Sequence, residues 1–92
     1  MIKTFAHKGL EQFFRYGEKA GLNAQYLPRL ARILDRLNGA TEPRDMNLPG
    51  FAFHGLHGNR KGTYSVKVSG NWRLTFRFKS GHAHDINLED YH

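Results

Sequence analysis

The sequence contains no cysteine among its 92 residues. Disulfide bonds, thiolate nucleophiles and cysteine-based metal sites are therefore excluded, and a reducing compartment is compatible with the composition. No apolar run approaches the roughly 20 residues that a membrane-spanning helix needs. Residues 1–6 also lack the apolar core of a signal peptide. We therefore expect a cytoplasmic protein with no membrane partner.

Patterns for bound cofactors are equally scarce. His82 and His84 share a strand face, but no third ligand is fixed beside them, so a metal site is not predicted. The glycine spacing matches no phosphate-binding loop, and no serine lies in a nucleophile elbow. We therefore expect no cofactor, no metal and no small-molecule substrate, which leaves acid–base chemistry on a phosphoester.

Positive charge is what the sequence has in excess. Its 14 Lys and Arg residues stand against 8 Asp and Glu, for a net charge of +6. The length suits a single domain over residues 1–92. A basic chain of this size favours an anionic partner, most often a nucleic acid, although charge alone is equally compatible with an ordinary basic domain.

Two amphipathic helices are predicted in the first half of the chain. Residues 7–17 place three apolar side chains at helical spacing, and Gly17 fits a helix stop. A second helix is expected over residues 25–38, with Pro28 in its first turn. Its arginines share a face that is most simply interpreted as solvated, with ribosomal RNA or an acidic antagonist as the alternative contact: Arg29, Arg32 and Arg36.

Strands are predicted before and after these helices. Residues 2–6 form a short first strand, residues 51–57 a strand with a flexible end, and residues 82–88 a last strand that is followed by a tail over residues 89–92. Residues 40–50 contain two prolines and are expected to form a loop.

A hairpin between residues 63–69 and 72–79 is the clearest signal. Apolar side chains alternate with polar and basic ones along both strands, so one face is apolar and the other is polar. Directly opposed residues share a face, which sets Val66 opposite Leu74. The element order then predicts an α+β fold, in which an N-terminal strand and two helices precede four antiparallel strands. The helices pack on the apolar face of the sheet, and the other face is left open.

The turn of this hairpin fixes what lies on the open face. A three-residue turn at residues 69–71 is expected, because it places Val68 opposite Trp72 and keeps both faces uniform. The same register pairs Lys67 with Arg73. A polyanion lying on this face would relieve the repulsion between the two cations.

The open face gathers the groups that metal-free RNA cleavage requires. Such cleavage needs a base for the ribose 2′-OH, a cation for the phosphorane and an acid for the leaving 5′-oxygen. Arg73 can hold a phosphate through two parallel hydrogen bonds, and the imidazoles of His54 and His92 can serve as base or acid. Asp90 could orient a histidine or accept a proton, and Tyr91 could bond the phosphate or stack on a base.

Further cations lie beside these candidates. His57, Arg60 and Lys61 lie on the loop that leads out of the strand carrying His54, and Lys67 lies opposite Arg73. Each residue alone has a simpler structural interpretation, such as a solubilising side chain. Their expected convergence on one face favours an RNA-binding surface.

Several segments of the chain resemble the HigB-type toxins of bacterial toxin–antitoxin systems, which belong to the RelE superfamily. The likeness covers nearly the whole chain, and two of its motifs are specific in combination. These are Asn71-Trp72-Arg73 and the closing Asp90-Tyr91-His92.

The resemblance implies an mRNA interferase, which enters the A site of a translating 70S ribosome and cuts the message there by attack of the 2′-OH. It also implies a bacterial cytoplasmic location and a helix-turn-helix antitoxin of the HigA type as partner. The family's catalytic motif carries over onto His54, Arg73, Asp90, Tyr91 and His92.

One segment departs from the family pattern. The common Leu-Lys-Gly is here Leu56-His57-Gly58, and the aspartate that often follows is Asn59. An imidazole is only partly protonated at neutral pH. Either His57 therefore supplies a weaker cation for RNA, or other cations compensate: Arg60, Lys61 or Lys67.

Two other functions remain compatible with the sequence. One is a non-catalytic toxin of the same fold, of the gyrase-poisoning type, against which the Asp-Tyr-His ending speaks. The other is a basic module that binds RNA or ribosomes without toxicity. Growth and message integrity after expression would separate these from a nuclease.

Overall fold

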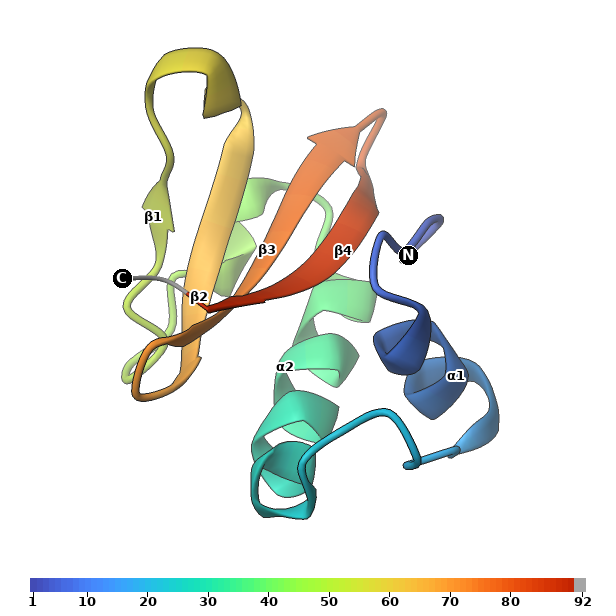
Figure 1. Cartoon of the computed structure of the whole chain (residues 1–92). Helices are drawn as coiled ribbons and strands as arrows, with labels where there is room; N and C mark the ends of the chain where they lie inside the picture. The colour runs from blue at the N-terminus through green and yellow to red at the C-terminus, as the bar shows by residue number, and fades with distance from the viewer. Residues whose placement is uncertain (91–92) are drawn as a thin grey trace.

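The computed structural model describes residues 1–90 and contains a four-stranded antiparallel sheet in the order β1-β2-β3-β4 (Figure 1). Two helices lie on the same side of this sheet. The predicted α+β fold is therefore confirmed. The elements are α1 (Lys8–Tyr16), η1 (Ala24–Tyr26), α2 (Leu27–Gly39), η2 (Pro43–Met46), β1 (His54–Gly55), η3 (Gly58–Arg60), β2 (Thr63–Ser69), β3 (Trp72–Lys79) and β4 (His82–Asp90).

Both helices end close to where the sequence predicts. The imidazole of His7 accepts a hydrogen bond from the backbone N–H of Leu10 and caps α1, which stops at Gly17 with φ 71°. The second helix begins at Leu27 rather than at residue 25, because residues 24–26 form the 3₁₀ turn η1. Pro28 lies in the first turn of α2, as expected. No helix within residues 1–90 is long and apolar enough to cross a membrane.

The core lies between the helices and the apolar side of the sheet. Four apolar residues of α2 are buried, as are three apolar side chains of the hairpin that face them, whereas Tyr64, Trp72 and Phe78 are half-buried against the same core. These residues alternate along β2 and β3 as the sequence predicts. The buried set on the two elements is Leu30, Ile33, Leu34 and Leu37 of α2 and Val66, Leu74 and Phe76 of the hairpin.

The predicted hairpin register is confirmed except at its turn. Lys67 pairs with Arg73, and Val66 pairs with Leu74. The three-residue turn is wrong: the turn has two residues, Gly70 and Asn71, and Ser69 rather than Val68 lies opposite Trp72. A bulge between Lys67 and Ser69 takes up the extra residue, so Lys67 still pairs with Arg73 and Val66 with Leu74 despite the shorter turn.

The predicted first strand is reduced to two isolated bridges. Ile2 and Phe5 run parallel to β4, opposite Ala83 and Ile86. Asp85 lies between these partners with φ 55°, and β4 carries an irregularity where it pairs with β3. This bend interrupts the ladder, so residues 2–6 pair with the edge of the sheet at two points only.

The strand predicted over residues 51–57 shortens to the two residues of β1. Ala52 adopts φ 47°, a left-handed conformation that breaks the extended run. The segment still lies along β2, because the Phe51 carbonyl accepts from the N–H of Lys67 at 2.7 Å. The predicted loop over residues 40–50 contains η2, whose capping residues are Glu42 and Asp45.

The arginine face of α2 is only partly the solvated surface that the sequence suggests. Arg29 donates from one terminal nitrogen to the carbonyls of Gly50 and Lys67, at 2.7 and 2.9 Å. Its guanidinium carbon also lies 4.8 Å from the ring centroid of Phe51. Arg29 therefore ties the segment before β1 to β2.

The last strand is longer than predicted. It continues through Glu89 to Asp90, which the sequence placed in a tail beyond the strand. Glu89 pairs with Arg73, and Asp90 pairs with Trp72. Tyr91 and His92, the last two residues of the predicted tail, lie outside the described residues.

Candidate active site

Two rows of side chains cross the polar side of the sheet. In the first row, His54 of β1 pairs with Ser65 of β2, which pairs with Thr75 of β3. In the second row, Lys67, Arg73 and Glu89 follow one another across β2, β3 and β4. Paired residues share a face, so both rows lie on the side away from the helices.

His54 is held so that one ring nitrogen is available for proton transfer. Its Nδ1 lies 3.1 Å from the carbonyl oxygen of Ala52. A carbonyl oxygen only accepts, so Nδ1 carries the proton and Nε2 of the neutral ring carries the lone pair. Nε2 lies 3.4 Å from the hydroxyl of Ser65, and the His54 side chain is exposed. This histidine can therefore accept or return a proton at the surface.

Arg73 is the most enclosed cation of the polar side. Its Nε and NH1 atoms are buried, while the residue as a whole is half-buried. It lies one row from His54 and two strands away. Sheet geometry puts the two Cα atoms roughly 12 Å apart, a span that an arginine side chain, a phosphate group and an imidazole can fill together.

The remaining predicted catalytic residues lie at the end of β4. Asp90 is exposed, and its pairing with Trp72 gives it the opposite side of the strand from Arg73 and Glu89. Tyr91 and His92 follow it in sequence and lie outside the described residues. The structure thus brings His54, Lys67 and Arg73 onto one surface and places Asp90 near it, at the end of β4 but on the other side of the strand.

An ion pair that the sequence did not predict covers the middle of the polar side. Arg60 donates from NH1 and NH2 to the two carboxylate oxygens of Glu89, each at 2.7 Å. Thr75 donates its hydroxyl to the same carboxylate at 2.6 Å. The hydrogen bond from Arg60 is the main cause that lowers the pKa of Glu89 below its ordinary value, and the same bond raises the pKa of Arg60.

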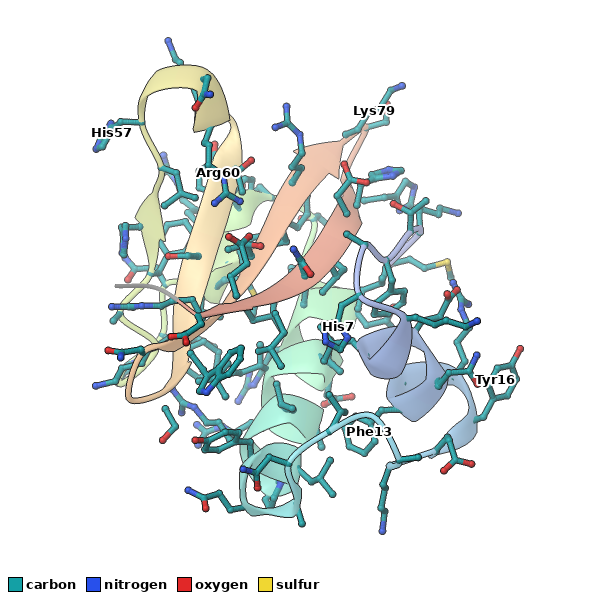
Figure 2. The ribbon with its side chains drawn as sticks, viewed as in Figure 1. His7, Phe13, Tyr16, His57, Arg60 and Lys79 are labelled. Carbon is teal, nitrogen blue, oxygen red and sulfur yellow. The ribbon has the colours of Figure 1, made fainter. Side chains whose placement is uncertain are left out.

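Two hollows flank this ion pair, and Arg60 lines both. One, of about 260 Å³, lies against β1 and also involves His54 and His57. The other, of about 190 Å³, lies over β3 and β4 and includes Arg77 and Glu89. Figure 2 shows Arg60 reaching inward over the sheet, whereas His57 on the same loop points outward.

Sequence reasoning missed Glu89 because it placed this residue in a tail. The alternation of β4 would have found it, because Asn87 pairs with Thr75 on the polar side and Glu89 follows two residues later. Arg77 was also missed as a contact. It donates to the Thr63 hydroxyl at 3.0 Å and so covers the neighbouring part of the polar side.

No three His, Asp or Glu side chains among residues 1–90 gather closely enough to hold a metal ion. The predicted pair His82 and His84 is half-buried on β4. Burial is the main cause that lowers the pKa of His82, so its neutral form is favoured.

Comparison with known proteins gives a family and two full-length relatives. Residues 3–92 match the HigB-like toxins, described as the RelE-like toxin of the type II toxin–antitoxin system HigB. Endoribonuclease HigB of Proteus vulgaris is 42% identical over 92 residues, which are the whole of both chains. Toxin HigB-1 of Vibrio cholerae is 32% identical over 93 residues, covering 99% of this chain and 98% of the relative.

A solved structure shares the fold at low sequence identity. One chain of the YoeB–YefM complex from Staphylococcus aureus superposes with a TM-score of 0.61 at 20% identity, covering 100% of this chain and 98% of the other. A likeness at this identity supports the arrangement of helices and sheet.

Proposed function

Because this chain belongs to the HigB-like family of RelE-like toxins from type II toxin–antitoxin systems, we propose that it is an endoribonuclease that cuts mRNA in the A site of a translating 70S ribosome. The observation that carries the proposal is the polar side of the sheet, where the exposed His54 and the half-buried Arg73 lie one row apart. Support for the activity comes from the full-length relative named as an endoribonuclease.

The proposed reaction needs only proton transfer and charge stabilisation. A base takes the proton of the ribose 2′-OH, and the 2′-oxygen forms a bond to phosphorus. The bond from phosphorus to the 5′-oxygen breaks, and an acid returns a proton to that oxygen. The products are a 2′,3′-cyclic phosphate and a free 5′-hydroxyl.

Arg73 and His54 divide two of these tasks. Arg73 is always charged and holds the phosphate while negative charge builds on it. His54, with its lone pair on Nε2, exchanges a proton on one side of the phosphate. The other proton transfer is assigned to Asp90 or His92, and Tyr91 is assigned a contact with the phosphate or a base. The labels of base and acid are interchangeable between this group and His54. The ribosome presents the message in line for attack.

The RNA contacts of the proposal lie around this centre. His57 and Lys61 are exposed on the loop after β1, and Lys67 is exposed beside Arg73. All three can meet the phosphate backbone. Arg60 lies on the same loop, but Glu89 occupies both of its terminal nitrogens. We therefore assign the phosphate contacts to His57, Lys61 and Lys67.

The partner of a toxin of this kind is an antitoxin. The YoeB–YefM structure from Staphylococcus aureus is a complex of such a pair. For this chain we propose a helix-turn-helix antitoxin of the HigA type, acting in the bacterial cytoplasm.

The test is primer extension on a message in a purified translation system. Wild-type protein is expected to produce discrete cuts when ribosomes are present and none on naked RNA. His54→Ala should cut about 10²–10⁴-fold more slowly, because one proton transfer loses its carrier. His84→Ala removes a histidine from the same sheet and serves as the matched control.

Each outcome of this test has a clear meaning. Cuts on naked RNA at the same rate would contradict ribosome dependence. A message left intact by the wild-type protein would contradict the nuclease. Growth arrest with an intact message would then favour the non-catalytic toxin, and unaffected growth would favour a simple RNA-binding module.

A further inference from the structure

We propose that Arg60 and Glu89 form a positioning pair, which holds the loop after β1 and the end of β4 in place for cleavage and does not itself contact the RNA. This inference rests on the proposed nuclease function. It changes the role that the sequence suggests for Arg60, and it gives Glu89 a role that no sequence motif assigns.

Hydrogen bonds hold the positioning pair in a fixed geometry. Two parallel hydrogen bonds of 2.7 Å join the guanidinium of Arg60 to the carboxylate of Glu89. The buried hydroxyl of Thr75 adds a third bond of 2.6 Å from beneath. A carboxylate with three such donors has a fixed orientation, and a bidentate pair restricts both partners more than a single bond does.

The positioning pair joins the two segments that carry the proposed catalytic residues. Arg60 ends η3, which follows β1 and its His54. Glu89 directly precedes Asp90 at the end of β4. The strand β1 has only two residues, so its ladder with β2 alone holds the His54 segment over a short length, whereas Glu89 is paired in the ladder of β3 and β4. A cross-link between them fixes the distance between the two sides of the scissile phosphate.

Charge explains why Arg60 is unsuited to bind RNA directly. Glu89 lies opposite Arg73, where a carboxylate would repel an incoming phosphate. Its pairing with Arg60 neutralises that charge. An arginine that left Glu89 to hold a phosphate would expose the repulsion that it now cancels. The pair therefore keeps the surface beside Arg73 suitable for RNA only while it stays intact.

Glu89→Gln separates positioning from direct RNA binding, because the two roles predict opposite signs. The variant removes a negative charge from the RNA-facing surface and frees Arg60. If Arg60 bound RNA, affinity would rise and the cleavage rate would hold or increase. The positioning role predicts that kcat on ribosome-bound message falls about 10- to 100-fold while KM stays equal or decreases, because misplaced catalytic groups slow the chemical step.

A double-variant cycle tests whether the two residues act as one unit. Arg60→Ala/Glu89→Gln is expected to be about as slow as either single variant, whereas independent roles would multiply the two losses. Arg60→Lys keeps the charge without the parallel bonds and should give an intermediate kcat. Lys79→Ala removes one cation at the far end of β3 (Figure 2) and controls for net charge.

The outcomes also separate this inference from the proposed function. Thermal unfolding first confirms that each variant is folded, and Arg60→Lys carries the test if Glu89→Gln is not. Wild-type cleavage together with an unchanged kcat for Glu89→Gln would overturn the positioning pair and leave the nuclease intact. A strictly multiplicative cycle would overturn it as well. A wild-type protein that does not cut would instead overturn the proposed function itself.

Discussion

Val66 and Leu74 on the helix side of the hairpin, and Ser65 and Thr75 on its polar side, are all nearly inaccessible, with exposures of 0, 0, 2 and 4%. The first two are covered by the apolar core. The other two lie beneath polar and charged side chains, through hydrogen bonds with His54 and Glu89. The same two strands are therefore buried on one side by non-directional packing and on the other by directional bonds.

Because of this difference, the core side of the hairpin mainly stabilises the fold, whereas the polar side can carry out chemistry. The core side gains free energy from every apolar atom and tolerates no charge. The polar side depends on a few bonded groups around an exposed histidine and an enclosed arginine, and a substrate can approach it. Substitutions at neighbouring positions of one strand should thus have effects of different kinds.

The largest effect on folding is expected for Leu74→Ala. Leu74 is fully buried, and its loss should reduce the free energy of unfolding by about 2–5 kcal/mol through lost burial and an internal cavity. Denaturant unfolding measures this value. Any folded fraction should still cut the message, because Leu74 points away from the polar side. A stable but inactive Leu74→Ala protein would contradict the division between the two sides.

A smaller effect, felt on both sides, is expected for Arg29→Ala. The substitution removes the hydrogen bonds to Gly50 and Lys67 and the contact with the Phe51 ring. Unfolding free energy should fall by about 2–3 kcal/mol, as for a bonded charged group. Cleavage should also slow, because the segment leading to His54 loosens. Arg36→Ala, on the same helix and exposed, is the control and should change neither measurement by much.

How far the sequence predicted this structure depends on the kind of information involved. Helix ends and strand faces follow from local rules: Gly17 stops a helix, and Val66 and Leu74 alternate with polar neighbours. The shortening of the strand predicted over residues 51–57 does not follow from local rules. It depends on the left-handed backbone of Ala52, and alanine normally avoids this conformation. The two-residue turn was missed because a bulge between Lys67 and Ser69 leaves the register of the rest of the hairpin as predicted.

The sequence predicted the part of the candidate site that follows from strand alternation, and it did not predict the part that depends on tertiary contacts. His54, Lys67 and Arg73 come together because strand alternation and register place them. The partner of Arg60 could not be foreseen once Glu89 was placed in a tail, since an ion pair between residues 29 positions apart depends on tertiary structure. The roles of Asp90, Tyr91 and His92 remain predictions.

The smallest effect on stability is expected when the pH is lowered. The folded-state pKa of Glu89 is lowered, mainly by the hydrogen bond from Arg60. The pair therefore contributes its full stability above about pH 4.3, the ordinary pKa of glutamate, and loses it as the pH falls through the lower folded-state value. As the pH falls through this range, the free energy of unfolding should decrease by about 1 kcal/mol more for the wild-type protein than for Glu89→Gln. Unfolding midpoints measured at pH 6 and at about pH 3 give the comparison. Equal losses would show that the pair adds no stability.

The division between the two sides is tested most directly by the single-turnover cleavage rate of Arg73→Ala on ribosome-bound message. Arg73 is the sequence neighbour of Leu74 and lies on the opposite side of the same strand. The expected rate is about 10²–10³-fold below wild type, because the developing phosphorane charge loses its cation. The free energy of unfolding should change by about 1 kcal/mol or less. Cleavage at the wild-type rate by this variant would contradict the account.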